Sequence, residues 1–210
     1  MDERTIYVLD NNGAVRRSLQ RLPSSANFKT VTYEDPAVFL AAAKNLKPGC
    51  VLLDIPLMRM SLEVQAQLNK IRSDLPIIVV TAEGDVPTAV LAMKAGASDF
   101  LEKPYSDEAL LRSIEAALSN ASASGRSNEL TDAARRITTL TRRERDVLDG
   151  LLAGRPNKLI AYDLGISVRT VEVHRARMME RLGIRQAAEL IRLGVLARLG
   201  AGLLSKPSKG

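Results

Sequence analysis

The chain has 210 residues, enough for two modest domains, and its 46% hydrophobic content allows each of them a core. Aromatic residues make up 3%, with no tryptophan, which disfavours the stacking platforms that bind single-stranded nucleic acid. The net charge of +6 is concentrated in residues 137–210, where 14 basic and 7 acidic residues give +7, against −1 in the rest. Such an asymmetry is expected when one domain binds nucleic acid.

The single cysteine, Cys50, excludes an intramolecular disulfide and suits a reducing compartment. The N-terminal residues lack the basic and apolar segments of a signal peptide, and no apolar run is long enough to span a bilayer. We therefore expect a cytoplasmic protein with no membrane partner.

Short β-rich runs alternate five times with stretches of helical spacing in the first half of the chain. The predicted strands are Ile6–Leu9, Thr30–Tyr33, Val51–Leu53, Ile77–Val80 and Asp99–Glu102. The predicted helices are Val15–Leu22, 36–46, Leu62–Ile71, Val86–Lys94 and Asp107–Leu118. This alternation predicts an α/β fold, a doubly wound parallel sheet of five strands with helices on both faces.

Polar side chains follow four of the five predicted strands, namely Asp10, Asp54, Thr81 and Lys103. In open parallel sheets the carboxyl ends of the strands form the ligand site, so these side chains should converge at one edge. A carboxylate can attack a phosphoryl group, a second acid can hold a divalent cation, and a lysine and a hydroxyl can bind the remaining oxygens. Any one of these residues alone would be an ordinary loop start.

Residues 5–119 resemble the receiver domain of two-component response regulators, which has a flavodoxin-like fold, and we assign residues 1–120 to it. The resemblance lies in VLDNN after the first strand, LLD at Asp54, VVTAEGD at Thr81, and MKAGASDFLEKPY around Lys103. It implies that Asp54 accepts phosphate from a sensor histidine kinase and that Thr81 and Lys103 sense the phosphoryl group. It also implies that Phe100 is the aromatic that swings inward as the threonine moves.

The acid pocket departs from the receiver pattern. The family usually has two adjacent acids after the first strand, whereas here Asp10 is followed by Asn11 and Asn12. By resemblance, Asp10, Asp54 and the backbone carbonyl of Pro56 would hold Mg²⁺, and the neutral Asn11 should weaken that binding. Pro56 stands two residues after Asp54 instead of four, and Leu62 stands at the usual glycine position, so the intervening loop should be reshaped.

Two hypotheses for control follow from these departures. In one, Asp54 is phosphorylated as in conventional receivers, with a weaker dependence on Mg²⁺. In the other, which we favour, the receiver is atypical and works with weak or absent phosphorylation. The segment after it, residues 121–136, begins with a linker composition and ends with helical character. It is either a flexible tether or a helical extension packed against one of the domains.

The last part of the chain predicts four helices. These are 142–154, Lys158–Leu164, Val168–Leu182 and Ala187–Leu196. Thr141 and Glu144 form the sequence pattern of a capping box before the first of them. A short helix, a glycine-containing turn at Gly165 and a longer arginine-bearing helix match a helix-turn-helix.

This part resembles the LuxR-type DNA-binding domain over its full length, so the whole chain resembles response regulators of the NarL/FixJ class. The matching residues are Thr141, Glu144, Val147, Leu148, Gly154, Asn157, Lys158, Ile160, Ala161, Leu164, Ser167, Thr170, Val171, Val173, His174 and Leu182. The resemblance implies that the helix from Val168 enters the major groove of double-stranded DNA.

The resemblance places Glu172, Val173 and Ala176 nearest base edges, where a carboxylate can accept from cytosine and valine can contact a thymine methyl. The residues expected at the flanks or on phosphates are Lys158, Arg169, Thr170, His174, Arg175 and Arg177. Residues 137–200 would form this all-α domain, and residues 201–210 a loose tail.

A helix-turn-helix of this size is expected to bind two half-sites as a homodimer, with Leu190, Ile191 and Leu193 as the contact. Two other classes of function remain open. One is an enzyme acting through Asp10 and Asp54, although the sequence has no Walker loop, dinucleotide fingerprint or nucleophile elbow. The other is an interaction module whose DNA output has been lost. The hypothesis we prefer is a DNA-binding regulator that the receiver domain controls.

Overall fold

The computed structural model describes residues 4–10, 28–54, 58–82, 86–121 and 123–204. The chain forms two compact units, one of residues 1–84 and 94–122 and the other of residues 85–93 and 123–210. The predicted helix Val15–Leu22 lies outside the described residues. No described helix is long and apolar enough to cross a membrane.

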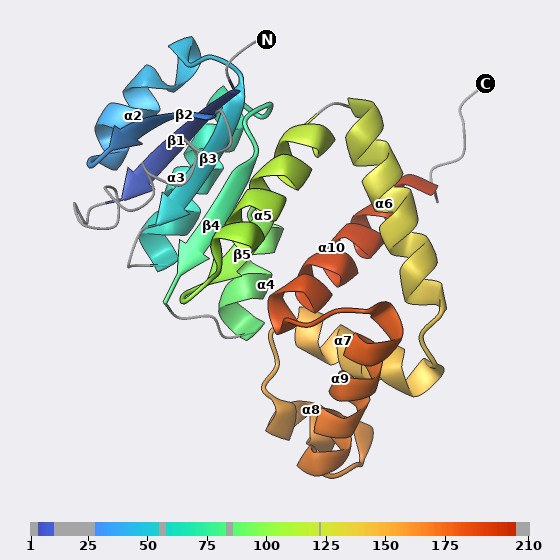
Figure 1. Cartoon of the computed structure of the whole chain (residues 1–210). Coiled ribbons are helices and arrows are strands. Elements are labelled where there is room, and N and C mark those ends of the chain that lie inside the picture. Colours follow the sequence, from blue (N-terminus) through green and yellow to red (C-terminus); the bar gives the residue numbers. More distant parts are fainter. Residues whose placement is uncertain (1–3, 11–27, 55–57, 83–85, 122, 205–210) are drawn as a thin grey trace. The chain divides into compact units, whose positions relative to one another are not determined.

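The first unit is built on a parallel sheet of five strands, in the order β2-β1-β3-β4-β5 (Figure 1). The strands are β1 (Arg4–Asp10), β2 (Phe28–Tyr33), β3 (Gly49–Asp54), β4 (Ile77–Thr81) and β5 (Asp99–Glu102). The order changes direction between β1 and β3, the position where open α/β sheets place their ligand site. The predicted fold class is confirmed.

The central strands β1, β3 and β4 are buried on both faces because they are apolar at most positions, whereas the edge strands β2 and β5 are partly exposed. Ile6 and Val8 point to the face that Leu110 and Ile114 of α5 (Asp107–Asn120) cover. The alternating residues, such as Leu53, are equally buried. Further buried side chains come from α2 (Pro36–Ala42), which the short 3-10 turn Ala43–Asn45 continues, and from α3 (Met58–Ile71).

Helix starts follow local capping chemistry. The Asp35 side chain accepts a hydrogen bond from Ala37 N and caps α2, and Ser106 caps α5 in the same way through Ala109 N. The helix α3 begins at Met58, four residues before the predicted start. Another described helix of the first half of the chain is α4 (Val86–Lys94).

The described residues 123–204 of the second unit contain the four predicted helices and one more. They are α6 (Ala123–Thr138), α7 (Arg142–Leu152), α8 (Asn157–Leu164), α9 (Val168–Leu182) and α10 (Ala187–Leu204). The capping box that begins α7 is present, since Glu144 N donates to Thr141 Oγ1 and Thr141 N donates to Glu144 Oε2. Gly165 ends α8 with a φ of 64°, a left-handed conformation that favours glycine.

One segment of this unit was left open by the sequence, and one predicted boundary needs correction. Residues 123–138 form the helix α6, which lies against α10 (Figure 1). Of the two alternatives for this segment, the structure therefore has the helical extension and not the flexible tether. The last helix runs to Leu204 instead of Leu196, so residues 201–204 of the predicted loose tail are helical. Residues 205–210 lie outside the described residues.

Candidate functional site

The two aspartates of the predicted pocket lie side by side. Asp10 ends β1 and Asp54 ends β3, and the parallel register pairs them directly across the two strands. Both are buried, with 2% of Asp10 and 7% of Asp54 exposed. Adjacent carboxylates out of water repel each other unless a cation lies between them or beside them. The pocket therefore attracts positive charge.

Lys103 supplies such a charge. Its ammonium forms an ion pair and hydrogen bond with Asp54 Oδ2. The lysine is placed by the end of β5, where its backbone N donates to the Thr81 carbonyl at 2.8 Å. Thr81 ends β4 and is half-buried. The four strand-end residues thus meet at one edge of the sheet, as the strand pattern predicted.

Tyr105 borders the same pocket, although its sequence pattern did not predict a part for it in the site. Burial raises the pKa of this half-buried phenol to about 12, and the negative charges of Asp54 and Asp10 contribute to the increase. Its ring packs against the core beneath α5. An aromatic two residues after the lysine was the only sequence signal for it.

Phe100, the predicted switch aromatic, lies inside the protein with 2% of its surface exposed. Its backbone N donates to Asp99 Oδ1, and the other oxygen of Asp99 accepts from Ser113 Oγ of α5 at 2.6 Å. These contacts tie β5 to α5. Because the side chain of phenylalanine has no polar atom, burying it leaves no side-chain hydrogen-bonding group unsatisfied.

The residues expected to alter the metal site are only partly described. Asn11, Asn12 and Pro56 lie outside the described residues. Leu62 lies within α3, a helical position that requires no glycine. Among the described side chains, Asp10 and Asp54 fit a divalent cation by their chemistry, but Lys103 already binds one of the Asp54 oxygens. Cation binding there has to compete with the lysine.

Four of the predicted DNA-contacting residues of α9 share one face. Arg169, Glu172, Val173 and Ala176 follow the spacing i, i+3, i+4 and i+7, and each is exposed or half-buried. Arg177 lies beside them and is also exposed. Arg169 Nη1 stands 3.7 Å from Glu172 Oε2, an exposed ion pair that a partner can replace cheaply.

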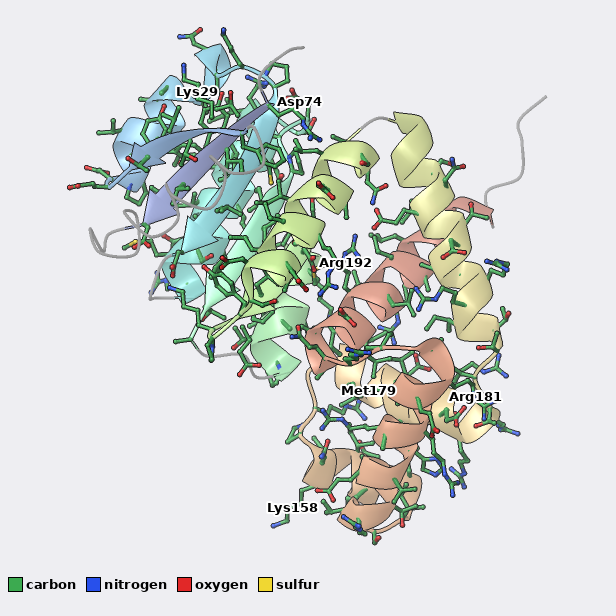
Figure 2. The ribbon with its side chains drawn as sticks, in the orientation of Figure 1. Lys29, Asp74, Lys158, Met179, Arg181 and Arg192 are labelled. Atoms are coloured by element: carbon green, nitrogen blue, oxygen red, sulfur yellow. The ribbon has the colours of Figure 1, made fainter. Side chains whose placement is uncertain are left out.

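The opposite face of α9 is held in the unit's core. Val171, Met178 and Leu182 are buried against the neighbouring helices. Arg181 Nε lies 3.3 Å from Glu144 Oε2 and links the end of α9 to the capped start of α7 (Figure 2). Burial raises the pKa of Glu144, but the hydrogen bonds to Thr141 and the Arg181 charge more than offset this and lower it below the usual value.

The start of α8 lies within reach of α9. Arg175 Nη1 donates to Asn157 Oδ1 at 3.1 Å, which joins the middle of α9 to the first residue of α8. Pro156 precedes α8 and provides no side-chain cap, and Leu159 N donates to the Pro156 carbonyl, so the amides of Asn157 and Lys158 are the ones that can bind an anion. Lys158 beside them is exposed and projects outward (Figure 2).

Thr170 and His174, the other predicted contacts, are half-buried. The Thr170 hydroxyl lies 2.8 Å from that of Ser167, the residue that caps α9. By contrast, Leu190, Ile191 and Leu193 of the predicted dimer contact are all buried within the single chain. Asn157 is the site residue that the sequence prediction missed most clearly. It is among the residues that match the LuxR-type domain, but no role was predicted for its side chain, which accepts the hydrogen bond from Arg175.

Known proteins match both halves of the chain. The family described as "Response regulator receiver domain" matches residues 6–115, and "Bacterial regulatory proteins, luxR family" matches residues 138–194. The transcriptional regulatory protein FixJ of Azorhizobium caulinodans is 42% identical over 194 residues, 91% of this chain and 92% of that protein. FixJ of Rhizobium meliloti is 38% identical over 202 residues, 95% of this chain and 99% of that protein.

A solved structure is similar over the same extent. Full-length FixJ from B. japonicum has a TM-score of 0.54 and 39% identity, covering 95% of this chain and 99% of that chain. The receiver and helix-turn-helix geometry, these matches and the sequence motifs agree. The chain therefore belongs to the NarL/FixJ class of response regulators, DNA-binding transcriptional regulators of two-component systems, and is not an enzyme.

Proposed function

We propose that this protein regulates transcription by inserting α9 into the major groove of double-stranded DNA as a homodimer, under the control of an atypical receiver. In this proposal the receiver covers residues 1–120, and residues 137–200 form the DNA-binding domain. The observation that carries the DNA contact is the exposed stripe on α9 described above, whose opposite face is fixed by buried Val171, Met178 and Leu182.

Base contacts are assigned to the centre of that stripe. Glu172 presents an exposed carboxylate that accepts from a cytosine amino group, and Val173 and Ala176 offer apolar surface to a thymine methyl. When Glu172 binds a base, its ion pair with Arg169 breaks. The loss of free energy is small because this ion pair is exposed and 3.7 Å long.

Phosphate contacts are assigned to the edges of the same surface. Arg175 is oriented by Asn157 and still has donors to offer, Lys158 is exposed beside it, and the uncapped start of α8 adds backbone amides. Arg177, His174 and Thr170 complete this group of contacts. Such contacts fix the position on DNA, while the stripe selects the sequence.

Control by the receiver is proposed to depend little on Mg²⁺-assisted phosphorylation of Asp54. The supporting observation is the ion pair between Lys103 and Asp54. With Asn11 where the family has an acid, two carboxylates and one lysine leave a net charge of −1 to attract a divalent cation. A third acid would double that charge. In this proposal the input signal acts through receivers that pair without being phosphorylated.

The conventional alternative, activation by phospho-Asp54 from a sensor histidine kinase, also has an observation in its favour. Asp10, Asp54, Thr81 and Lys103 do converge at the edge of the sheet. Receiver domains as a family use Mg²⁺ at this site, and Asp10 with Asp54 would hold it here. The two alternatives differ in whether Asp54 becomes modified.

Incubation with acetyl phosphate and Mg²⁺, followed by intact mass, separates them. The atypical mechanism predicts little or no phosphate adduct at concentrations of Mg²⁺ that saturate an ordinary receiver. A stoichiometric adduct on the wild-type chain, absent from Asp54→Ala, would establish the conventional mechanism. Sedimentation of the same samples reports whether the adduct changes the oligomeric state.

Selection of duplexes from a random library tests the DNA contact and the remaining alternative, an interaction module without DNA output. The proposal predicts recovery of a recurrent sequence by the wild-type chain. A chain with Glu172→Ala and Arg175→Ala should not recover it. Failure of the wild-type chain to retain any duplex would favour the interaction module.

A further inference from the structure

The helix α9 ends at a carbonyl group that is bound from outside the helix. In its last turn, Ile184 N donates a hydrogen bond to the Met179 carbonyl at 2.8 Å, as is usual where a helix ends. The Leu182 carbonyl instead accepts a hydrogen bond of 2.7 Å from Arg136 Nη2 of α6. Because the last carbonyls of a helix have no partner within it, a donor from another element fixes the position of the helix end.

The charge of Arg136 suits this position. A helix carries a partial negative charge at its C-terminal end, so a guanidinium is stabilising there. Hydrogen bonds from a charged donor are roughly twice as strong as neutral ones. The Arg136 side chain is also half-buried, which limits the competition from water. This contact therefore holds the end of α9 more firmly than an ordinary surface hydrogen bond does.

The helix that carries Arg136 is itself held in place. It packs extensively along α10 (Figure 1). Glu129 of α6 forms an ion pair with Arg192, and Leu130 approaches Gly200 so closely that a Cβ on the glycine would lie 2.6 Å from the Leu130 backbone oxygen. Because α6 cannot shift along α10 without losing these contacts, Arg136 presents its guanidinium at a fixed place.

A second arginine holds the same end of α9. Arg181 Nε of α9 lies 3.3 Å from Glu144 Oε2 of α7 (Figure 2). Contacts with two different helices restrict the tilt of α9, whereas a single contact would leave a pivot. Glu172 stands about 15 Å along the helix from Leu182, at 1.5 Å of rise per residue. A small change of angle at the C-terminal end is thus enough to misplace hydrogen bonds that read bases.

We infer that Arg136 is a positioning residue for sequence recognition: by holding the Leu182 carbonyl, it sets the angle at which α9 presents Glu172 and Val173 to base edges. The inference rests on the proposed reading of DNA by α9 and names what sets the geometry of that contact. Arg136 lies in α6, just before the DNA-binding domain of residues 137–200 in that proposal. A residue from the segment that precedes the domain therefore contributes to the accuracy with which the domain reads DNA.

A direct phosphate contact is the competing role for Arg136, since a guanidinium binds phosphate well. The two roles differ in their dependence on salt. A direct contact releases a counterion and makes affinity for every duplex more sensitive to salt, whereas a positioning residue changes the preference for one sequence over another.

Arg136→Met and Arg135→Met in the full-length chain form a matched pair of variants. Each removes one positive charge from α6 and keeps a long unbranched side chain. Arg135 is the control because it is exposed and its ion pair is with Asp132 of the same helix. Fluorescence anisotropy across salt concentrations gives the affinity for two duplexes. One is the duplex that the wild-type chain selects from a random library, and the other is a scrambled duplex of the same composition.

For Arg136→Met, the ratio of the two affinities should fall about tenfold, the usual value of one base contact. Its salt slope should match that of Arg135→Met, whose affinity ratio should equal the wild-type ratio. A wild-type ratio for Arg136→Met would overturn the inference. So would a salt slope shallower than that of Arg135→Met by about one, because it would show a direct phosphate contact.

Two further variants separate positioning from a merely structural role. Arg136→Lys keeps the charge and a donor, so its affinity ratio should lie nearer to wild type than that of Arg136→Met; an equal loss in both would contradict the inference. A lower melting temperature of Arg136→Met with a wild-type ratio below that temperature would assign the contact to stability alone and overturn the inference. If circular dichroism shows that Arg136→Met does not fold, Arg136→Gln, which keeps a polar group of shorter reach, is judged by the same ratio.

The same titrations distinguish a failure of this inference from a failure of the proposed function. If wild type and Arg136→Met prefer the selected duplex equally, the inference is wrong and the DNA-binding proposal stands. If wild type prefers no duplex over its scrambled form, the DNA-binding proposal fails and the inference falls with it.

Discussion

The guanidinium of Arg175 donates a hydrogen bond to the side-chain oxygen of Asn157, 3.1 Å away, and so connects the recognition helix α9 to the first residue of α8. The position of this arginine is therefore set by two helices. A phosphate lying between them would meet Arg175, Lys158 and the uncapped amides of α8 together.

Arg175→Ala should weaken binding to every duplex, because it removes a phosphate contact that carries no sequence information. The slope of log affinity against log salt should become shallower by about one, as one fewer counterion is released. A fluorescence anisotropy titration across salt concentrations measures both effects. Arg135→Ala removes the same charge from exposed α6 and serves as the control; an equal change in slope there would show that net charge alone is responsible.

Glu172→Ala should relax sequence choice by about 1–3 kcal/mol at one base pair, the usual value of a good base contact. The salt slope should stay nearly the same because no phosphate contact is lost. Glu180→Ala, an exposed acid two turns further along the same helix, provides the comparison. Competition between the selected duplex and its single-base variants gives the measurement, and undiminished discrimination by Glu172→Ala would remove this residue from the base contacts.

Glu144→Gln should destabilise the DNA-binding domain by about 1 kcal/mol near neutral pH, the usual contribution of a helix cap. The pKa of Glu144 is lowered in the folded protein, so its carboxylate contributes stability above the unfolded pKa. That contribution is lost as the pH falls through the lowered folded pKa. Thermal unfolding at neutral and acid pH should thus show a difference between wild type and Glu144→Gln that disappears on acidification. A difference independent of pH would assign the effect to packing.

Asn11→Asp should restore part of the usual receiver pocket. An added carboxylate beside Asp10 should raise Mg²⁺ affinity on the order of tenfold, or about 1.4 kcal/mol. Lys103→Ala should also raise it, because the ammonium no longer competes for Asp54. Isothermal titration with Mg²⁺ alone measures both variants. Wild-type affinity as high as that of Asn11→Asp would show that the second acid is dispensable.

The strand pattern was sufficient to predict the sheet and the meeting of Asp10, Asp54, Thr81 and Lys103. Parallel strands that are buried on both faces appear as continuous hydrophobic runs in the sequence. Their carboxyl ends lie at one edge of the sheet because the strands run in the same direction, independently of their side chains. The ion pair between Lys103 and Asp54 was not predictable, because it depends on whether the lysine side chain extends past β4, which lies between their two strands. Local chemistry likewise fixed the start of α7, where Thr141 and Glu144 satisfy each other within one turn.

The helix α6 shows where local pattern fails. Its first residues, Ala123 to Asn128, have the composition of a linker, and isolated helices of that composition are weak. Packing against α10 favours the helix, since Leu130 lies against Gly200, 70 positions later in the chain. The extension of α10 past Gly200 has the same origin, since that glycine is unfavourable in a free helix but permits the close approach of Leu130.

The central claim is that the exposed face of α9 reads a DNA sequence on behalf of a dimer. Selection from a random duplex library by the full-length wild-type chain, with Glu172→Ala processed in parallel, tests it most directly. We expect wild type to enrich two related half-sites and Glu172→Ala to enrich the same arrangement with one position in each half-site relaxed. Enrichment of an identical sequence by both chains, or of no repeated half-site by wild type, would contradict it.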